Sequence, residues 1–119
     1  MNIAVLDIGS NTTKILIAAK NKAGKLESVA KKSYPCRLGT ALSQDRPVLS
    51  VVLMEATIKV IEQLLSFASP FSPVKTRIVA TEALRRMENA DLLIKEVQHL
   101  FALNIEILSG TEEAFFIAN

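Results

Sequence analysis

The sequence is poor in cysteine and histidine, and no apolar run in it is long enough to cross a membrane. With one cysteine, Cys36, among 119 residues, no internal disulfide bond can form, which suits a reducing compartment. His99 has no second histidine or cysteine at metal-ligand spacing, so a surface position is favoured over a zinc site. The amino terminus lacks a basic region followed by a long apolar segment, so neither a signal peptide nor a transmembrane helix is predicted. We therefore expect a cytoplasmic protein without a membrane partner.

A strong excess of either charge is also missing. The chain carries 14 Lys and Arg residues against 12 Asp and Glu residues, a formal net charge of +2. This mixed balance argues against a nucleic-acid partner. Hydrophobic residues make up 50% of the chain, which is enough for the core of one small domain.

What the sequence does contain is a polar stretch, residues 7–14, between two apolar segments that are predicted strands. Two close strands joined by a glycine-containing turn form a β-hairpin. The backbone N–H groups of such a turn can converge on an anion, and Gly9 lets the backbone approach a ligand closely. Four further residues add neutral hydrogen-bond donors: Ser10, Asn11, Thr12 and Thr13.

Asp7 lies at the carboxyl end of the first predicted strand, where its carboxylate could hold Mg²⁺ or a water bound to it. These features predict a phosphate loop with a metal-facing aspartate. The alternative is an ordinary hairpin, because Asp, Gly, Ser and Asn are also frequent turn formers. The stretch alone leaves both interpretations open.

Hydrophobic periodicity predicts the remaining elements. Residues 34–39 should leave the sheet, because Pro35 cannot donate to a strand ladder. Ser50 and Asn89 are expected to cap the two long helices. The second of these helices should bury three residues, Leu93, Val97 and Leu100. The predicted strands span residues 1–6, 14–19, 25–33, 76–80 and 104–108, and the predicted helices span 50–68, 81–87, 90–101 and 111–118.

The predicted order is β-β-β-α-β-α-β-α, which indicates an α/β protein. The first three strands form an antiparallel meander, whereas strands separated by helices pair in parallel through right-handed crossovers. The result is a mixed sheet with helices on its faces, the ribonuclease H-like arrangement. Ligands gather at the carboxyl ends of strands in such sheets. Three polar clusters follow strands, at residues 7–13, 81–85 and 109–113, so we expect them to meet at one edge.

Four segments resemble motifs of the exopolyphosphatase/guanosine pentaphosphate phosphohydrolase (Ppx/GppA) family, in order and at the family's spacing. Residues 7–11 resemble its first phosphate motif, and residues 37–39 (Arg-Leu-Gly) are similar to its segment after the third strand. Residues 80–85 with Asn89 resemble its Thr-x-Ala-x-Arg segment, and residues 109–114 resemble its Ser-Gly-x-Glu-Glu-Ala motif. The first motif alone would also suit sugar kinases and actin-like ATPases.

The resemblance implies the amino-terminal portion of the first of two actin-like ATPase domains. Residues 1–119 end before the family's second glycine-rich phosphate motif, so that motif and the partner domain are expected to be absent. The face on which the missing elements would pack should be apolar, which could drive homodimerisation. Lys14 stands where the family often has arginine; it keeps the charge but loses the bidentate fork.

The resemblance also implies a reaction, the removal of terminal phosphate from inorganic polyphosphate or guanosine pentaphosphate with Mg²⁺. Such hydrolysis needs a water in line with the phosphorus and neutralised charge on the phosphate oxygens. Asp7 is expected to hold the metal. Lys14 and Thr81 are secondary candidates for the site as a whole, with no metal assigned to them. The expected phosphate-binding residues are Gly9, Ser10, Asn11, Thr12 and Arg85. The alternative from a different class is a non-catalytic module that senses phosphate or a nucleotide.

Glu112 and Glu113 are the candidates for the carboxylate that activates the water. Ser109 and Glu112 have the spacing of a capping box, so Glu112 should reach back to the start of its helix. Glu113 is then the freer acid, and the resemblance independently points to Glu113 as the catalytic base. Acids also favour the first turn of a helix for electrostatic reasons alone, so Glu112 remains a secondary candidate.

Overall fold

The computed structural model describes residues 1–36, 38–39 and 47–108, and it shows a five-stranded sheet with helices. Three strands come first, then a long helix and a strand, then two helices and a last strand, as predicted. The strands are β1 (Asn2–Ile8), β2 (Thr12–Lys20), β3 (Leu26–Pro35), β4 (Lys75–Ala80) and β5 (Ile105–Ile107). The helices are α1 (Val51–Ala68), the 3₁₀ turn η2 (Ser69–Phe71), α2 (Glu82–Arg85) and α3 (Ala90–Phe101).

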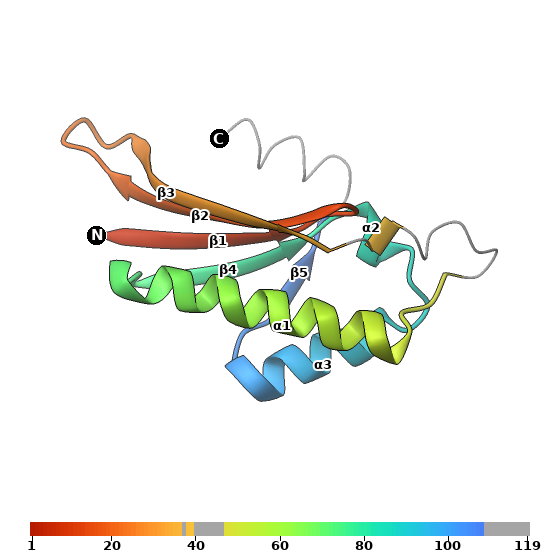
Figure 1. Cartoon of the computed structure of the whole chain (residues 1–119). Coiled ribbons are helices and arrows are strands. Elements are labelled where there is room, and N and C mark those ends of the chain that lie inside the picture. The colour runs from red at the N-terminus through yellow and green to blue at the C-terminus, as the bar shows by residue number, and fades with distance from the viewer. Residues whose placement is uncertain (37, 40–46, 109–119) are drawn as a thin grey trace.

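The sheet is mixed, with the strand order β3-β2-β1-β4-β5 (Figure 1). β1 pairs antiparallel with β2 and parallel with β4, and β4 pairs parallel with β5. This is the predicted arrangement, because a meander of three strands is joined through β1 to strands that are separated by helices. The predicted helix over 111–118 lies outside the described residues.

The core lies between the sheet and the two long helices, which pack on one side of the sheet in Figure 1. In β1, Ala4, Leu6 and Ile8 are buried on the helix side, and the alternating residues Val5 and Asp7 are half-buried on the other side. The period-2 alternation of β1 therefore sends its one acidic side chain to the opposite face from the core.

Helix α1 begins where the sequence predicts. The Ser50 Oγ accepts a hydrogen bond from the Leu53 N–H at 3.1 Å, which caps the helix. One stripe of α1 is buried against the sheet, and it consists of Thr57, Ile61, Leu64 and Ala68. No helix among the described residues combines the length and the apolarity needed to cross a membrane.

Three local predictions are wrong. β3 continues through Tyr34 to Pro35, because β3 is an edge strand and its last residue needs no donor on the open side. Leu100 is 50% exposed, since the buried face of α3 is completed by Leu93 and Val97.

Asn89 occupies the N-cap position of α3 but makes no capping hydrogen bond. Its side chain instead pairs with the backbone of Leu49: the Leu49 N–H donates to Asn89 Oδ1 at 2.7 Å, and Asn89 Nδ2 donates to the Leu49 carbonyl at 2.9 Å. The Glu88 N–H also donates to the Pro47 carbonyl at 2.8 Å. These bonds tie the entrance of α1 to the turn before α3.

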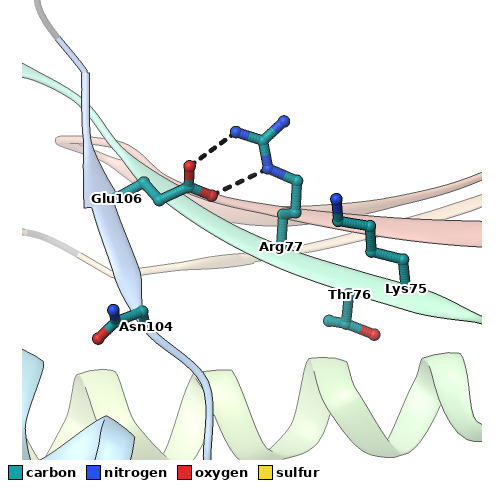
Figure 2. Close-up of a pocket in the computed structure, with 5 residues that line it drawn as sticks. All are labelled: Lys75, Thr76, Arg77, Asn104 and Glu106. Carbon is teal, nitrogen blue, oxygen red and sulfur yellow. Dashed lines mark hydrogen bonds and ion pairs between the residues drawn. The ribbon is translucent and has the colours of Figure 1, made fainter.

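An ion pair joins β4 and β5 on the face of the sheet away from the core. Figure 2 shows Arg77 and Glu106 pointing toward each other, with Arg77 Nε and Nη2 donating to the two carboxylate oxygens at 2.9 and 2.7 Å. The hydrogen bond from Arg77, together with the positive charges of Arg77 and Lys75, holds the pKa of Glu106 below its ordinary value of 4.5. A lowered carboxylate pKa stabilises the fold only while the carboxylate is ionised.

We expect Glu106→Gln to lower the free energy of unfolding at pH 7 by about 1 kcal/mol or less, because the two side chains are 39% and 43% exposed and solvent screens them. The contribution should be complete above pH 4.5 and should vanish as the pH falls through the lowered pKa of Glu106. Urea unfolding at pH 7 and pH 3 measures it, with Glu62→Gln on the exposed side of α1 as the control. A deficit of equal size at both pH values would contradict the role of the ion pair.

Candidate functional site

Backbone hydrogen bonds bring two of the predicted polar clusters, residues 7–13 and 81–85, to one edge of the sheet together with the end of β5. The third predicted cluster, residues 109–113, lies outside the described residues. At the carboxyl end of β1, the Ile8 carbonyl accepts from the Thr81 N–H at 3.4 Å. At the carboxyl end of β4, the Ala80 carbonyl accepts from the Leu108 N–H at 2.8 Å. Figure 1 shows α2 beside the β1–β2 turn at this end of the sheet. The turn, residues 81–85 and the end of β5 therefore meet, as the order of the strands predicts.

The β1–β2 turn consists of Gly9, Ser10 and Asn11. The Gly9 N–H donates to the Thr12 carbonyl at 3.0 Å, so this N–H closes the turn. A Cβ on Gly9 would lie 2.8 Å from that carbonyl oxygen, a distance that the backbone could accept only by moving. Glycine at this position is thus required by the close approach within the turn itself, in addition to any approach of a ligand.

A second segment lies against the turn. The Cys36 thiol donates to the Gly9 carbonyl at 3.1 Å, and the Cys36 N–H donates to the Asn11 carbonyl at 2.9 Å. The Gly39 N–H donates to the Ser10 carbonyl at 2.7 Å. We call Cys36, Leu38 and Gly39 the bracing segment. It accounts for all three carbonyl oxygens of the turn.

Sequence reasoning missed the contribution of Cys36, of which it concluded only that no internal disulfide bond can form. The thiol is buried, and its partner lies 27 residues away in the sequence. A long-range contact of this kind leaves no periodic signal in the sequence. The resemblance did point to residues 37–39, although it assigned no task to Gly39.

Thr12 and Thr13 belong to β2 and not to the turn. Thr12 is exposed at the start of the strand, but Thr13 is completely buried on the helix side. The expectation that Thr13 donates to a bound anion is therefore wrong, because its side chain shares the core face with Ile15 and Ile17. Within the described part of the chain, the Thr13 Oγ1 has no hydrogen-bond partner.

We expect Thr13→Val to raise the free energy of unfolding by about 1 kcal/mol. Burial removes the Thr13 hydroxyl from water, and no hydrogen bond within the described ranges of the protein compensates for that loss. Valine keeps the branched shape of the side chain that fills this place in the core. Chemical denaturation of the parent and the variant measures the difference. A loss of stability would mean that the hydroxyl is satisfied in solution, for example by a buried water.

Asp7 and Lys14 face each other across the β1–β2 pair. They are direct cross-strand neighbours, so their side chains lie on the same face of the sheet, the face away from α1. Asp7 is half-buried and Lys14 is exposed. A negative and a positive side chain are thus placed together close to the turn, with Ile8 and Thr13 as the next cross-strand pair between them and it.

The position of Asp7 is compatible with a magnesium ion that binds together with a phosphate substrate. Among the described residues, no three His, Cys, Asp or Glu side chains gather into a ready metal cage. Mg²⁺ commonly binds one or two carboxylates and takes its other ligands from phosphate oxygens and water. A single carboxylate at the carboxyl end of β1, beside the turn, matches that mode.

Thr81 and Arg85 stand on the second segment of the edge. Thr81 is half-buried, and its carbonyl accepts from the Arg85 N–H at 3.2 Å, which forms the single turn of α2. Arg85 Nη1 donates to the Leu108 carbonyl, directly before the acidic segment. The structure therefore brings Arg85 to the predicted edge and joins it to the chain that leads to Glu112 and Glu113. Those two acids and Ser109 lie outside the described residues.

A polar hollow of about 580 Å³ lies elsewhere, where β4 and β5 begin (Figure 2). It is lined by Lys75, Thr76, Arg77, Asn104 and Glu106. Its Arg77 and Glu106 already neutralise each other. The turn and residues 81–85 lie at the other ends of the strands. We therefore place the candidate site at the edge formed by the carboxyl ends of β1 and β4, and not in this hollow.

Comparison with known proteins gives both a family match and similar solved structures. Residues 16–119 match the Ppx/GppA phosphatase family. The structure of the family member from Aquifex aeolicus is 30% identical, covers 95% of this chain and superposes with a TM-score of 0.85. The type II variant of the Aquifex aeolicus phosphatase is also 30% identical, over 92% of this chain, with a TM-score of 0.82.

An exopolyphosphatase from Cytophaga hutchinsonii ATCC 33406 is 19% identical and covers 97% of this chain with a TM-score of 0.86, which supports the fold alone. The chain spans 36% of the length of each of these three structures. The family match extends over more than half of the chain, and the fold agrees with it. This chain belongs to the Ppx/GppA phosphatase family.

Proposed function

We propose that the chain forms the amino-terminal part of a phosphohydrolase that removes the terminal phosphate from inorganic polyphosphate or guanosine pentaphosphate. The observation that carries the proposal is the meeting of the β1–β2 turn, residues 81–85 and the end of β5 at one sheet edge. Membership of the Ppx/GppA phosphatase family supports a phosphoanhydride substrate. The remaining part of the active site would come from a second glycine-rich motif and a second domain.

The turn and Arg85 would bind the phosphate. Ser10 and Asn11 offer backbone N–H groups and neutral side chains, which suit the oxygens of a phosphate. Arg85 can neutralise charge on those oxygens, as can Lys14 at the end of the hairpin. Thr81, which is bonded to the end of β1, offers a hydroxyl beside them.

The Asp7 carboxylate would hold Mg²⁺, directly or through a bound water. When bound, the ion would neutralise negative charge that develops on the transferred phosphate oxygens. Lys14, directly opposite on β2, adds a positive charge on the same face of the sheet. Together these groups would orient a phosphate chain along the end of the hairpin.

The hydrolytic step needs a water aligned with the terminal phosphorus. The water oxygen bonds to that phosphorus, the bond to the bridging oxygen breaks, and the water proton passes to a carboxylate. We assign the proton acceptor to Glu113 and a helix-capping task to Glu112. Arg85, bonded to the Leu108 carbonyl, anchors the backbone that leads to both acids.

A phosphate-release assay tests the proposal on the 119-residue chain and on the full-length protein that contains it. We expect Mg²⁺-dependent release from polyphosphate or guanosine pentaphosphate by the full-length protein only, because one loop cannot enclose a terminal phosphate from both sides. Full-length protein that binds these anions without turnover would support the alternative, a phosphate- or nucleotide-sensing module. Rapid turnover by the 119-residue chain would contradict the divided site.

A further inference from the structure

The turn that carries the proposed phosphate ligands is fixed through its carbonyl oxygens, which accept hydrogen bonds from the bracing segment. Three consecutive carbonyls, those of Gly9, Ser10 and Asn11, accept hydrogen bonds at 3.1, 2.7 and 2.9 Å. All three donors belong to Cys36 and Gly39 of the bracing segment. An ordinary hairpin turn of this length needs no such support, since its ends are already paired in the ladder.

Because these carbonyl oxygens are hydrogen-bonded to the bracing segment, the N–H groups of the same peptide units point in a fixed direction. None of the described peptide bonds is cis, and in a planar trans peptide the N–H points opposite to the C=O of the same unit. The Ser10 N–H shares its peptide unit with the Gly9 carbonyl, and the Asn11 N–H shares its unit with the Ser10 carbonyl. Both N–H groups therefore point away from the bracing segment, and the carbonyl oxygens that would repel an anion point toward it.

The bracing segment is suited to hold this arrangement. Leu38 is completely buried and Cys36 is 7% exposed, so the segment is anchored in the core. Gly39 lies close enough to the turn that an added Cβ would be 3.3 Å from the Asn11 side-chain oxygen and 3.5 Å from the Ser10 carbonyl oxygen. The absence of a side chain at residue 39 lets the two segments meet at hydrogen-bonding distance.

We infer that Cys36 and Gly39 are positioning residues for phosphate binding: they orient the β1–β2 turn so that the Ser10 and Asn11 N–H groups face the phosphate. The inference rests on the proposed function, because it takes the turn as the phosphate site. Neither residue contacts the substrate in this arrangement; each acts through the backbone of the turn.

The test uses the full-length protein with tripolyphosphate as the probe, and it measures the dissociation constant, kcat, KM and the thermal midpoint. Cys36→Val removes the thiol donor at similar size, whereas Cys36→Ser keeps an O–H donor. Cys36→Val should weaken tripolyphosphate binding about five- to tenfold, the effect of one lost hydrogen bond. Cys36→Ser should restore the dissociation constant to within about twofold of the parent.

Gly39→Ala should raise the dissociation constant and KM by a similar factor, because a methyl group 3.3 Å from the Asn11 side-chain oxygen and 3.5 Å from the Ser10 carbonyl oxygen would push the turn away from the Gly39 N–H. Thr13→Val is the matched control, since it also changes a buried side chain next to the turn but breaks no hydrogen bond among the described residues. It should leave both constants unchanged.

The outcomes separate the two proposals. A parent protein that neither binds nor hydrolyses tripolyphosphate, polyphosphate or guanosine pentaphosphate overturns the proposed function and this inference with it. A working parent whose folded Cys36→Val and Gly39→Ala variants bind as tightly as the parent overturns the inference alone. Cys36→Ser failing like Cys36→Val, at an unchanged thermal midpoint, also overturns it, because the hydrogen bond would then not be the cause.

Discussion

Glu113→Gln should reduce phosphate release by the full-length protein about a hundred- to ten-thousand-fold, the usual effect of losing a general base. Glutamine keeps the size of the side chain but cannot accept the proton of the attacking water. Binding of polyphosphate should persist, because the amide removes a negative charge from a site that binds an anion. Steady-state kinetics with a separate binding measurement distinguishes the two effects.

The neighbouring acid provides the matched comparison. Glu112→Gln should leave kcat close to that of the parent and cost about 1 kcal/mol of stability or less, as expected for a capping interaction. The two variants carry the same chemical change at neighbouring positions, so general effects of charge cancel when they are compared. If Glu112→Gln is the inactive variant and Glu113→Gln turns over normally, the assignment of the two acids is reversed.

Asp7→Asn should abolish Mg²⁺-dependent phosphate release, a loss of at least about a hundredfold. The amide has nearly the shape of the carboxylate, but it lacks the negative charge that Mg²⁺ prefers in a ligand. The fold should survive, since Asp7 lies on the face of the sheet away from the core. Phosphate release measured over a range of Mg²⁺ concentrations, together with circular dichroism, checks both expectations.

Asp91→Asn is the control for this change, because Asp91 is an exposed residue in the first turn of α3. It should leave turnover and its Mg²⁺ dependence unaltered. Unchanged turnover in a correctly folded Asp7→Asn variant would remove Asp7 from the mechanism. A variant rescued by higher Mg²⁺ would instead indicate a weakened metal site, as the assignment requires.

The sheet could be predicted from the sequence because its signals are local. The alternation in β1 places Ala4, Leu6 and Ile8 on one face, and the strand–helix–strand order requires the parallel pairs. The same alternation also placed Thr13 with Ile15 on the core face, so the error at Thr13 came from assigning it to the turn instead of the strand.

The support of the turn could not be predicted in this way. Cys36 and Asn89 each bond to a backbone group far away in the sequence, the Gly9 carbonyl and the Leu49 backbone. Local propensity predicts an N-cap for Asn89 because the backbone N–H groups at the start of α3 are its nearest hydrogen-bond partners in the sequence. The tertiary contact prevails in the folded chain, since it satisfies both a donor and an acceptor of the Asn89 amide.

The central place of β1 has a consequence for how the chain is made. β1 can pair with β2, and β2 with β3, as soon as these strands leave the ribosome, but the other neighbour of β1, β4, begins only at Lys75. At about 5–20 residues per second, the second edge of β1 stays open for several seconds of synthesis. An open strand edge is a template for pairing with another chain. A ribosome that stalls before residue 75 therefore leaves the strand that carries Asp7 as an aggregation-prone edge of the nascent protein.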